Sequence, residues 1–435
     1  MQDPARPRRI SIPRKPSFFT LFWILATIAE LHSHALRWTV GRGMGRRTIT
    51  IAFCLTFVTI PVLCVHSKHV RAGETSQVTL LRTPHEGIQP QTVLDRDGVL
   101  HMIYFNGDAS GGDIEYVSRK PNGKDFWEPI RVNSQPGRAI AIGTVRGPQL
   151  AVGRNGRVYV IWFGSQAGSG DPSNSMAVFF SRLNDSHAAF EPQRNLMQYA
   201  TGGDGGISIA ADARGDVYAV WHAAGAEPGE SHRRVYLARS TDEGKTFARE
   251  MPISPASLGA CGCCGMRAFA DDHGTLFILY RAATESVHRD MTLLASTDQG
   301  QTFRTTRVGP WELNACPMST AYLSEGGHRL LAAWETAGQV YFSSIDPISL
   351  RLSAATPAPG ESNKRKHPAV TASVNGQVLL AWTEGTGWSK GGSLAWQLFD
   401  GTGKAAGGQH SASGVPVWGL PSIFVDHQGN FTIFY

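Results

Sequence analysis

Four of the six cysteines in this chain fall in two short segments, Cys261-Gly-Cys-Cys-Gly-Met266 and Cys316-Pro-Met318. In an oxidising compartment disulfides are the default for such thiols, and four cysteines allow three pairings. A bridge between the adjacent Cys263 and Cys264 would need a strained geometry. A link from the first segment to Cys316 would instead join the two segments and leave two thiols over.

The same cysteines could hold a metal ion. Thiolates from Cys261, Cys263, Cys264 and Cys316, with Met266, Met318 and His222 nearby, would suit copper(I) or zinc. The Cys-x-Cys-Cys spacing is tighter than the Cys-x-x-Cys of common zinc sites, which weakens the case for zinc. The sequence thus allows three roles for the four cysteines: disulfide bonds, metal ligands, and free or redox-active thiols.

Charged residues beside recurring aromatic residues form a second group of candidates. Arg281 and Glu335 directly follow Tyr280 and Trp334, and Arg267 opens an apolar segment. Together with a histidine, His222, they could form a polar pocket for an anionic or hydroxylated ligand. The alternative is that they are solvated rim residues or ion pairs between structural repeats.

The elements that must position these residues recur through the sequence. An apolar segment, a turn rich in Asp, Gly and Asn, and a second segment with an aromatic end occur seven times. The second segments end at Tyr104, Trp162, Trp221, Tyr280, Trp334, Trp382 and Tyr435. The interval of about 50–60 residues matches a four-stranded propeller blade. No helix-length pattern follows residue 72, so we predict an all-β protein, a β-propeller with seven blades preferred and six as the alternative.

The last repeat is only half a blade, because the chain stops at Tyr435. The segment from Ser76 to Arg82 reads as a strand without a partner. Pairing it with the last repeat would close the ring and cover exposed strand edges. We therefore predict that the seventh blade is shared between the two ends of the propeller. The recurring aromatic residues should then be core residues.

An octet near the middle of the chain occurs twice, as Ser240-Thr-Asp-Glu-Gly-Lys-Thr-Phe247 and Ser296-Thr-Asp-Gln-Gly-Gln-Thr-Phe303. Its Asp can accept hydrogen bonds from turn amides, its Gly supplies a positive φ, and its aromatic residue can pack between strands. The octet resembles the Asp-box of the sialidase-like (BNR-repeat) β-propellers. The cysteine segments resemble those of a subset of these proteins with Cys-x-Cys-Cys and Cys-Pro elements.

The resemblance implies a glycosidase-like site at the mouth of the central channel. Sialidases clamp the substrate carboxylate with three arginines and use a Tyr–Glu nucleophile pair and an Asp acid/base. Asp108 and Asp113 occur where the acid/base is expected, Arg267 and Arg281 could bind an anionic group, and Glu335 could act as a base or orient the nucleophile. The first of the three clamp arginines should lie in residues 86–91, the equivalent stretch of this sequence, but these residues include no arginine. Cleavage of another sugar, or carbohydrate binding alone, therefore fits better than sialidase activity.

Three functions thus remain, and each makes a structural demand. A glycosidase needs two carboxylates about 5–10 Å apart. A non-catalytic module that recognises glycans or proteins needs aromatic platforms, for which Trp388, Trp418 and Phe163 are candidates. A metal protein needs sulfur atoms that converge on one ion.

The basic charge of the chain is concentrated at its N-terminus. Residues 1–71 hold 11 of the 41 Lys and Arg but only two of the 35 Asp and Glu, which leaves 30 basic against 33 acidic residues for 72–435. The main domain is therefore close to neutral, which gives no electrostatic case for nucleic-acid binding.

The N-terminal region reads as a leader. An apolar stretch at 48–65 follows Met44-Gly-Arg-Arg47 and precedes Val70-Arg-Ala72, as in a secretory signal peptide. We predict a leader at 1–72, with translation starting at Met44 and a signal peptide at 44–72, and a propeller at 73–435 that is secreted, periplasmic or on the cell surface. The alternative is an uncleaved anchor, which would be the only contact with a membrane.

Overall fold

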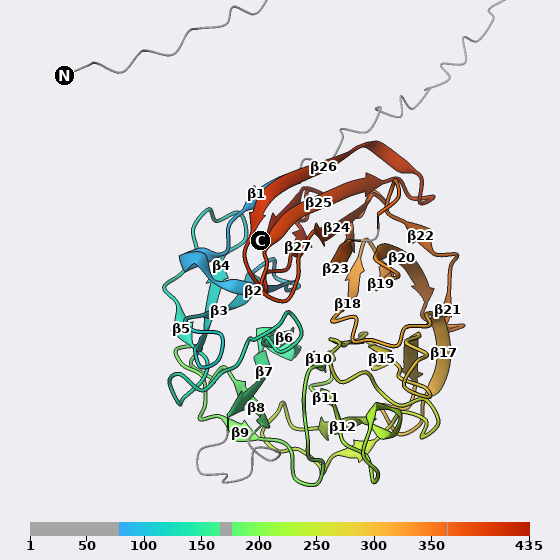
Figure 1. Cartoon of the computed structure of the whole chain (residues 1–435). Coiled ribbons are helices and arrows are strands. Elements are labelled where there is room, and N and C mark those ends of the chain that lie inside the picture. Colours follow the sequence, from blue (N-terminus) through green and yellow to red (C-terminus); the bar gives the residue numbers. More distant parts are fainter. Residues whose placement is uncertain (1–77, 166–175, 363) are drawn as a thin grey trace, which may run out of the picture. The chain divides into compact units, whose positions relative to one another are not determined.

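The computed structural model describes residues 78–165, 176–362 and 364–435, and the strands in this part of the chain form seven sheets (Figure 1). Six sheets hold at least four strands in simple up-and-down order. They are formed by β2 (Ile88–Leu94), β3 (Leu100–Asn106), β4 (Asp113–Arg119) and β5 (Ile130–Arg131); β6 (Gln149–Val152), β7 (Val158–Ser165), β8 (Met176–Arg182) and β9 (Arg194–Asn195); β10 (Ile207–Ala211), β11 (Val217–Ala223), β12 (Arg234–Ser240) and β13 (Met251–Pro252); β14 (Arg267–Ala270), β15 (Leu276–Arg281), β16 (Met291–Ser296) and β17 (Arg304–Gly309); β18 (Ala321–Gly326), β19 (Arg329–Thr336), β20 (Gln339–Asp346), β21 (Arg351–Leu352) and β22 (Thr356–Pro357); β23 (Arg365–Ala372), β24 (Val378–Glu384), β25 (Gly392–Phe399) and β26 (Ala405–Val415).

The seventh sheet joins β1 (Val78–Leu81) to β27 (Ser422–Val425) and β28 (Phe431–Phe434). Strand β1 pairs in parallel with β28, from Val78 opposite Phe431 to Leu81 opposite Phe434. The predicted closure of the ring by an N-terminal strand is therefore confirmed. The only helical elements in the described ranges are three short 3-10 turns, η1 (Pro84–Glu86), η2 (Arg154–Gly156) and η4 (Glu230–His232).

The innermost strands of the seven sheets contact one another in a closed cycle. Strand β2 contacts β6, and the cycle continues through β10, β14, β18, β23 and β27 back to β2. The domain is therefore a seven-bladed β-propeller, as the repeats predicted, and the six-bladed alternative is wrong (Figure 1).

Recurring aromatic residues pack between the blades. Trp162, Trp221 and Trp382 are fully buried, and Trp382 lies in a cluster with Phe431 of the last blade. The prediction that these residues form the core is confirmed for six of the seven, while Tyr435 is only partly buried against the core.

Aspartates cap the turns of several inner hairpins. Asp212 accepts hydrogen bonds from the main-chain N–H groups of Arg214 and Asp216, at 2.9 and 3.0 Å. Asp271 and Asp426 accept pairs of main-chain bonds in the same way in blades four and seven. These side chains replace backbone partners in the turn, which explains why Asp and Gly recur at this place.

Both octets have the local structure that their residues predicted. Asp242 accepts hydrogen bonds from the amide and hydroxyl of Thr246, at 2.8 and 2.6 Å, and Gly244 has a φ of 75°. Asp298 and Thr302 repeat this arrangement in the next blade, with distances of 2.9 and 2.6 Å. Phe247 packs edge-on against Phe180 of the preceding blade, at 4.8 Å between ring centroids.

The predicted leader at 1–72 and its apolar stretches lie outside the described residues. Within the described ranges, no helix has the length and hydropathy that crossing a membrane requires.

Candidate functional site

The central channel has two different ends. All seven inner strands begin at one end, which we call the site face, and they finish at the other, which we call the opposite face. The cysteine segments directly precede β14 and β18, so they belong to the site face.

A small pocket opens on the site face, with a volume of about 50 Å³. We call it the tryptophan pocket, after Trp388 and Trp418, whose rings meet nearly edge-to-face at 6.2 Å between centroids. Trp388 is half exposed. The other lining residues are Gly143, Thr144, Val145, Arg146, Cys263, Met318, Lys366, His367, Thr386 and Gly387.

Three lining residues have an unusual backbone conformation. Met318, His367 and Trp418 precede or open the inner strands of three consecutive blades, and their φ values are 46°, 53° and 60°. This left-handed region is uncommon for residues with a side chain, and such residues often mark binding sites. Here the left-handed conformation occurs at or just before the start of the inner strands, and all three residues line the same pocket.

The two cations of the pocket, Arg146 and Lys366, have different partners. Arg146 forms an ion pair with Asp204 and donates a further bond to the main-chain oxygen of Asp204 at 3.0 Å. Lys366 donates to the main-chain oxygen of Pro317 at 2.5 Å and has no ion pair with a described carboxylate. No Asp or Glu is among the described lining residues. The charged side chains among the described lining residues, Arg146 and Lys366, are therefore both cationic.

Of the three predicted aromatic platforms, Trp388 and Trp418 meet in this pocket. Phe163 is fully buried between blades and cannot act as a platform, so that prediction is wrong.

The four cysteines come together beside the tryptophan pocket. The sulfur of Cys261 lies 3.5 Å from that of Cys263 and 3.4 Å from that of Cys264. All three sulfurs lie within 4.8 Å of one another. The sulfurs of Cys263 and Cys316 lie within 4.8 Å of each other and of a carboxylate oxygen of Glu230.

The surroundings of Cys264 hold the pKa of its thiol well below the usual range. Burial raises its pKa, but hydrogen bonds from Cys261 and Cys263, the charge of Arg281 and the main-chain N–H of Ser319 together lower it. Hydrogen bonds to its two sulfur neighbours raise the pKa of Cys261. The three sulfurs thus belong to one hydrogen-bonded group.

Two buried histidines lie close to this group. Burial lowers the pKa of His222 and that of His367 to about 3. Nδ1 of His222 is 3.4 Å from Arg233, and its Nε2 has no hydrogen-bond partner. Neither histidine belongs to the groups of residues whose possible metal-ligand atoms all lie within 4.8 Å of one another. Met266, expected near the cysteines as a further ligand, packs into the apolar core between blades three and four.

The predicted catalytic residues are placed as follows. Arg281 is buried, and it donates to the main-chain oxygens of Arg289 and Glu335 at 2.7 and 2.5 Å. Glu335 is also buried; its Oε1 accepts from the N–H of Gly338 at 3.3 Å, and its Oε2 has no partner. Burial raises the pKa of Glu335. Neither Arg281 nor Glu335 lines the tryptophan pocket.

Arg267 lies inside the channel. It donates to the amide oxygens of Gln91 and Gln149, and its guanidinium lies 4.9 Å from the ring centroid of Tyr322. Burial lowers its pKa. It forms no ion pair with a described carboxylate. It lines a large cavity at the opposite face and also a second, smaller cavity that is distinct from the tryptophan pocket.

Asp108 lies on the loop between β3 and β4, and Asp113 is the first residue of β4. Asp108 is exposed, and hydrogen bonds from the hydroxyl and amide of Ser110 lower its pKa. Asp113 accepts from the Asn133 side chain at 2.7 Å and from the Gly137 amide at 2.8 Å. In the described part of the chain, no hydrogen bond or ion pair joins either aspartate to Glu335, Arg267 or Arg281.

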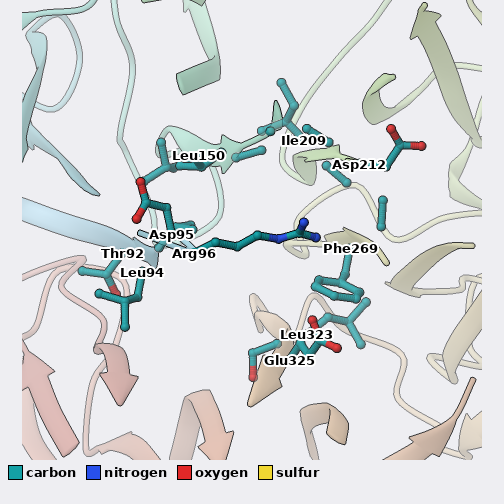
Figure 2. Close-up of a pocket in the computed structure, with 18 of the residues that line it drawn as sticks. Thr92, Leu94, Asp95, Arg96, Leu150, Ile209, Asp212, Phe269, Leu323 and Glu325 are labelled. Atoms are coloured by element: carbon teal, nitrogen blue, oxygen red, sulfur yellow. The ribbon is translucent and has the colours of Figure 1, made fainter. Parts of the chain in front are cut away.

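The opposite face holds a larger cavity of about 550 Å³ (Figure 2). Figure 2 shows the side chain of Arg96 extending across this cavity, and Arg96 forms an ion pair with Asp272. Asp95 and Asp212, also at its rim, are used in hairpin turns. Three of its acidic residues, Asp95, Asp212 and Asp272, thus have structural partners.

The sequence did not single out several residues around the cysteines. Glu230 accepts from the Gly262 amide at 2.7 Å and forms a 2.6 Å ion pair with Arg289. Lys366 precedes His367, which opens an apolar segment, but nothing in its own context marked it. Glu230 and Arg289 lie in loops outside the repeats, so periodicity could not find them.

No protein-family model matches the chain, and no curated protein sequence matches it either. Solved structures with a similar fold include a protein of unknown function from Dyadobacter fermentans, at 14% identity and a TM-score of 0.49, covering 78% of this chain and 97% of the other. A Hadza microbial sialidase is 15% identical, with a TM-score of 0.45 and coverage of 71% and 68%.

An α-L-arabinanase of Penicillium chrysogenum is 13% identical, with a TM-score of 0.47 and coverage of 75% and 98%. At identities this low, the activity of this chain has to be inferred from its own site.

Proposed function

We propose that this propeller is a carbohydrate-binding protein that packs an acidic sugar against Trp388 and Trp418 at the mouth of the tryptophan pocket. The observation that carries this proposal is the pairing of Trp388 and Trp418 beside Lys366. Aromatic faces pack against the apolar C–H groups of a sugar ring, and a few polar groups fix its orientation.

The charge of the pocket determines the class of sugar. Lys366 forms no ion pair with a described carboxylate, although its charge acts to lower the pKa of the buried Glu335 outside the pocket, and no described lining residue is acidic. A carboxylate or sulfate group on the sugar would supply the missing negative charge and form a charge-assisted hydrogen bond. Uronic acids, sialic acids and sulfated sugars share this chemistry.

We propose recognition rather than hydrolysis. A glycosidase needs a pair of carboxyl groups at the bound sugar, one of them with a raised pKa so that it can act as an acid. The tryptophan pocket offers no such pair among its described residues. Asp108, one of the two residues that the sequence placed where an acid is expected, has a lowered pKa instead.

The proposal is tested by measuring the binding of the purified protein to acidic and neutral oligosaccharides of equal length by calorimetry. We expect measurable affinity for the acidic series only. Trp388→Ala should weaken it by about tenfold or more, equivalent to about 1.4 kcal/mol. Lys366→Met should abolish the preference for acidic sugars.

Trp127→Ala is the matched control, because Trp127 is similarly exposed but lies outside the pocket. The affinity of this variant for acidic oligosaccharides should equal that of the unmodified protein. Binding that survives Trp388→Ala and Lys366→Met would overturn the assignment to this pocket. Acidic and neutral sugars binding equally would overturn the charge argument.

A further inference from the structure

We propose that Cys261, Cys263, Cys264 and Cys316 form a binding site for one thiophilic d10 metal ion, copper(I) or zinc(II). The site is separate from the carbohydrate proposal, although Cys263 also lines the tryptophan pocket. It lies between two neighbouring blades, since three of its residues precede β14 and the fourth precedes β18.

The separations between the sulfurs suit ligands of a shared ion. Four thiolates bound tetrahedrally at about 2.3 Å lie about 3.8 Å from one another. Cys261 is 3.5 Å from Cys263 and 3.4 Å from Cys264, and all three sulfurs lie within 4.8 Å of one another. Small side-chain rotations would bring them to the spacing that such an ion requires.

Disulfide bonding accounts less well for this geometry. A disulfide joins two sulfurs at about 2.05 Å. Pairing Cys261 with Cys264 and Cys263 with Cys316 would use all four sulfurs, but it would leave the contact between Cys261 and Cys263 without a role. Here Cys261 is equally close to two different sulfurs, and these belong to adjacent residues. No single pairing uses the contacts that the three sulfurs make.

The main chain of the cysteine segment is fixed on several sides. Gly205 and Gly206 of blade three donate to the oxygens of Gly262 and Cys264, at 2.9 and 3.0 Å. The amide of Cys261 donates to the oxygen of Arg281 at 2.9 Å. The sulfurs are therefore held in place before any ion binds, which lowers the cost of ordering the site.

Glu230 supports the site from outside. It accepts from the Gly262 amide at 2.7 Å, between the first two cysteines, and binds the buried Arg289 at 2.6 Å. Such hydrogen-bonded groups around the ligands orient them and tune a metal site. The buried Arg281 and Arg289 also offset the negative charge that several thiolates would bring.

The ligand type selects the class of ion. Thiolates favour soft or borderline ions, above all copper(I) and zinc. Cys261 and Cys264 are buried and Cys263 nearly so, whereas Cys316 is exposed and lies near Cys263. Three close sulfurs suit trigonal copper(I), and recruitment of Cys316 completes a tetrahedral set for zinc.

The test uses the full-length protein, reduced and kept under anaerobic conditions. It is loaded separately with zinc chloride and with copper(I) supplied as its acetonitrile complex, then desalted. We expect one ion of at least one metal per chain to be retained, with sulfur scatterers at about 2.3 Å in the X-ray absorption spectrum. Competition with a chelator of known affinity then shows which of the two ions binds more tightly.

Variants connect the ion to these sulfurs. Cys264→Ser should lose retention of either metal, whereas Cys316→Ser should lose retention of zinc, and the exposed position of Cys316 makes its variant the less disruptive of the two. Met266→Leu removes a nearby sulfur that packs in the apolar core, so it should bind metal normally. Equal thermal unfolding of the metal-free proteins checks that each variant is folded.

Two results would overturn the proposal. One is a reduced protein with four titratable thiols in the propeller that retains neither ion. The other is equal retention by the unmodified protein and by a folded Cys316→Ser variant, with absorption spectra that show nitrogen or oxygen neighbours only.

Discussion

The Nη2 atom of Arg281 donates a 2.5 Å hydrogen bond to the main-chain oxygen of Glu335, across the boundary between blades four and five. The two side chains were predicted as members of a catalytic pocket, yet they meet through the main chain. Because both are buried, this contact joins two blades beneath the site face.

Replacing Arg281 by methionine should therefore destabilise the propeller. The substitution leaves the main-chain oxygens of Arg289 and Glu335 without their charged donor. We expect a loss of about 3 kcal/mol in the free energy of unfolding, since hydrogen bonds to charged groups contribute about 1.5–3 kcal/mol each. Urea denaturation followed by tryptophan fluorescence measures this loss.

Arg96→Met provides the comparison, because Arg96 and its partner Asp272 are both exposed. Exposed ion pairs contribute less than about 1 kcal/mol. Equal destabilisation by the two substitutions would contradict the structural role of Arg281.

Gly206 should tolerate no side chain. A Cβ atom on Gly206 would lie 2.5 Å from Cδ2 of His222 and 2.7 Å from the main-chain oxygen of Cys264. Gly206→Ala must displace the cysteine segment, and we expect a loss of about 1–3 kcal/mol. Gly408→Ala has no atom within 4 Å of its new Cβ and should change stability by less than about 0.5 kcal/mol. Thermal unfolding of both variants is the measurement, and equal melting temperatures would contradict this packing.

Repetition made the fold predictable from the sequence. Trp162, Trp221 and Trp382 recur because each blade needs the same packing residue, and Asp212, Asp271 and Asp426 recur because hairpin turns need the same cap. The unpaired segment near Val78 predicted ring closure for a related reason, since an open sheet edge needs a partner.

The site was harder to predict, because its residues come from loops that do not repeat. Trp388 and Trp418 were identified as aromatic residues near the channel, but their contact depends on the path of two loops from neighbouring blades. From its position in the repeat, directly after Tyr280, the sequence predicted that Arg281 could bind an anionic ligand. Only the structure shows that two main-chain oxygens occupy its guanidinium.

The two octets should make the stability of the propeller depend on acidic pH. Hydrogen bonds from the hydroxyl and amide of Thr302 lower the pKa of Asp298 from 3.8 to about 2. A carboxyl group whose pKa is lower in the folded state stabilises that state above its unfolded pKa. This contribution is lost as the pH falls from about 4 to about 2.

Asp298→Asn should therefore lower the free energy of unfolding at pH 7, and its effect should shrink as the pH falls through this window. Denaturation of the variant and the unmodified protein at a series of pH values measures the difference. Asp125→Asn, at an exposed residue without a hydrogen bond, should have little effect at any pH. An Asp298→Asn effect that is constant from pH 7 to pH 2 would contradict the role of the charge.

Ring closure predicts a sharp boundary for N-terminal deletions. Removing residues 1–72 leaves β1 in place, whereas removing residues 1–82 deletes it and exposes the edge of β28 along its whole length. An uncovered strand edge offers unpaired N–H and C=O groups to other chains. We expect the longer deletion to lower the melting temperature and to produce oligomers on size-exclusion chromatography, while the shorter one stays monodisperse with an unchanged melting temperature. Because the two proteins differ by ten residues, similar behaviour of both would show that β1 does not hold the ring closed.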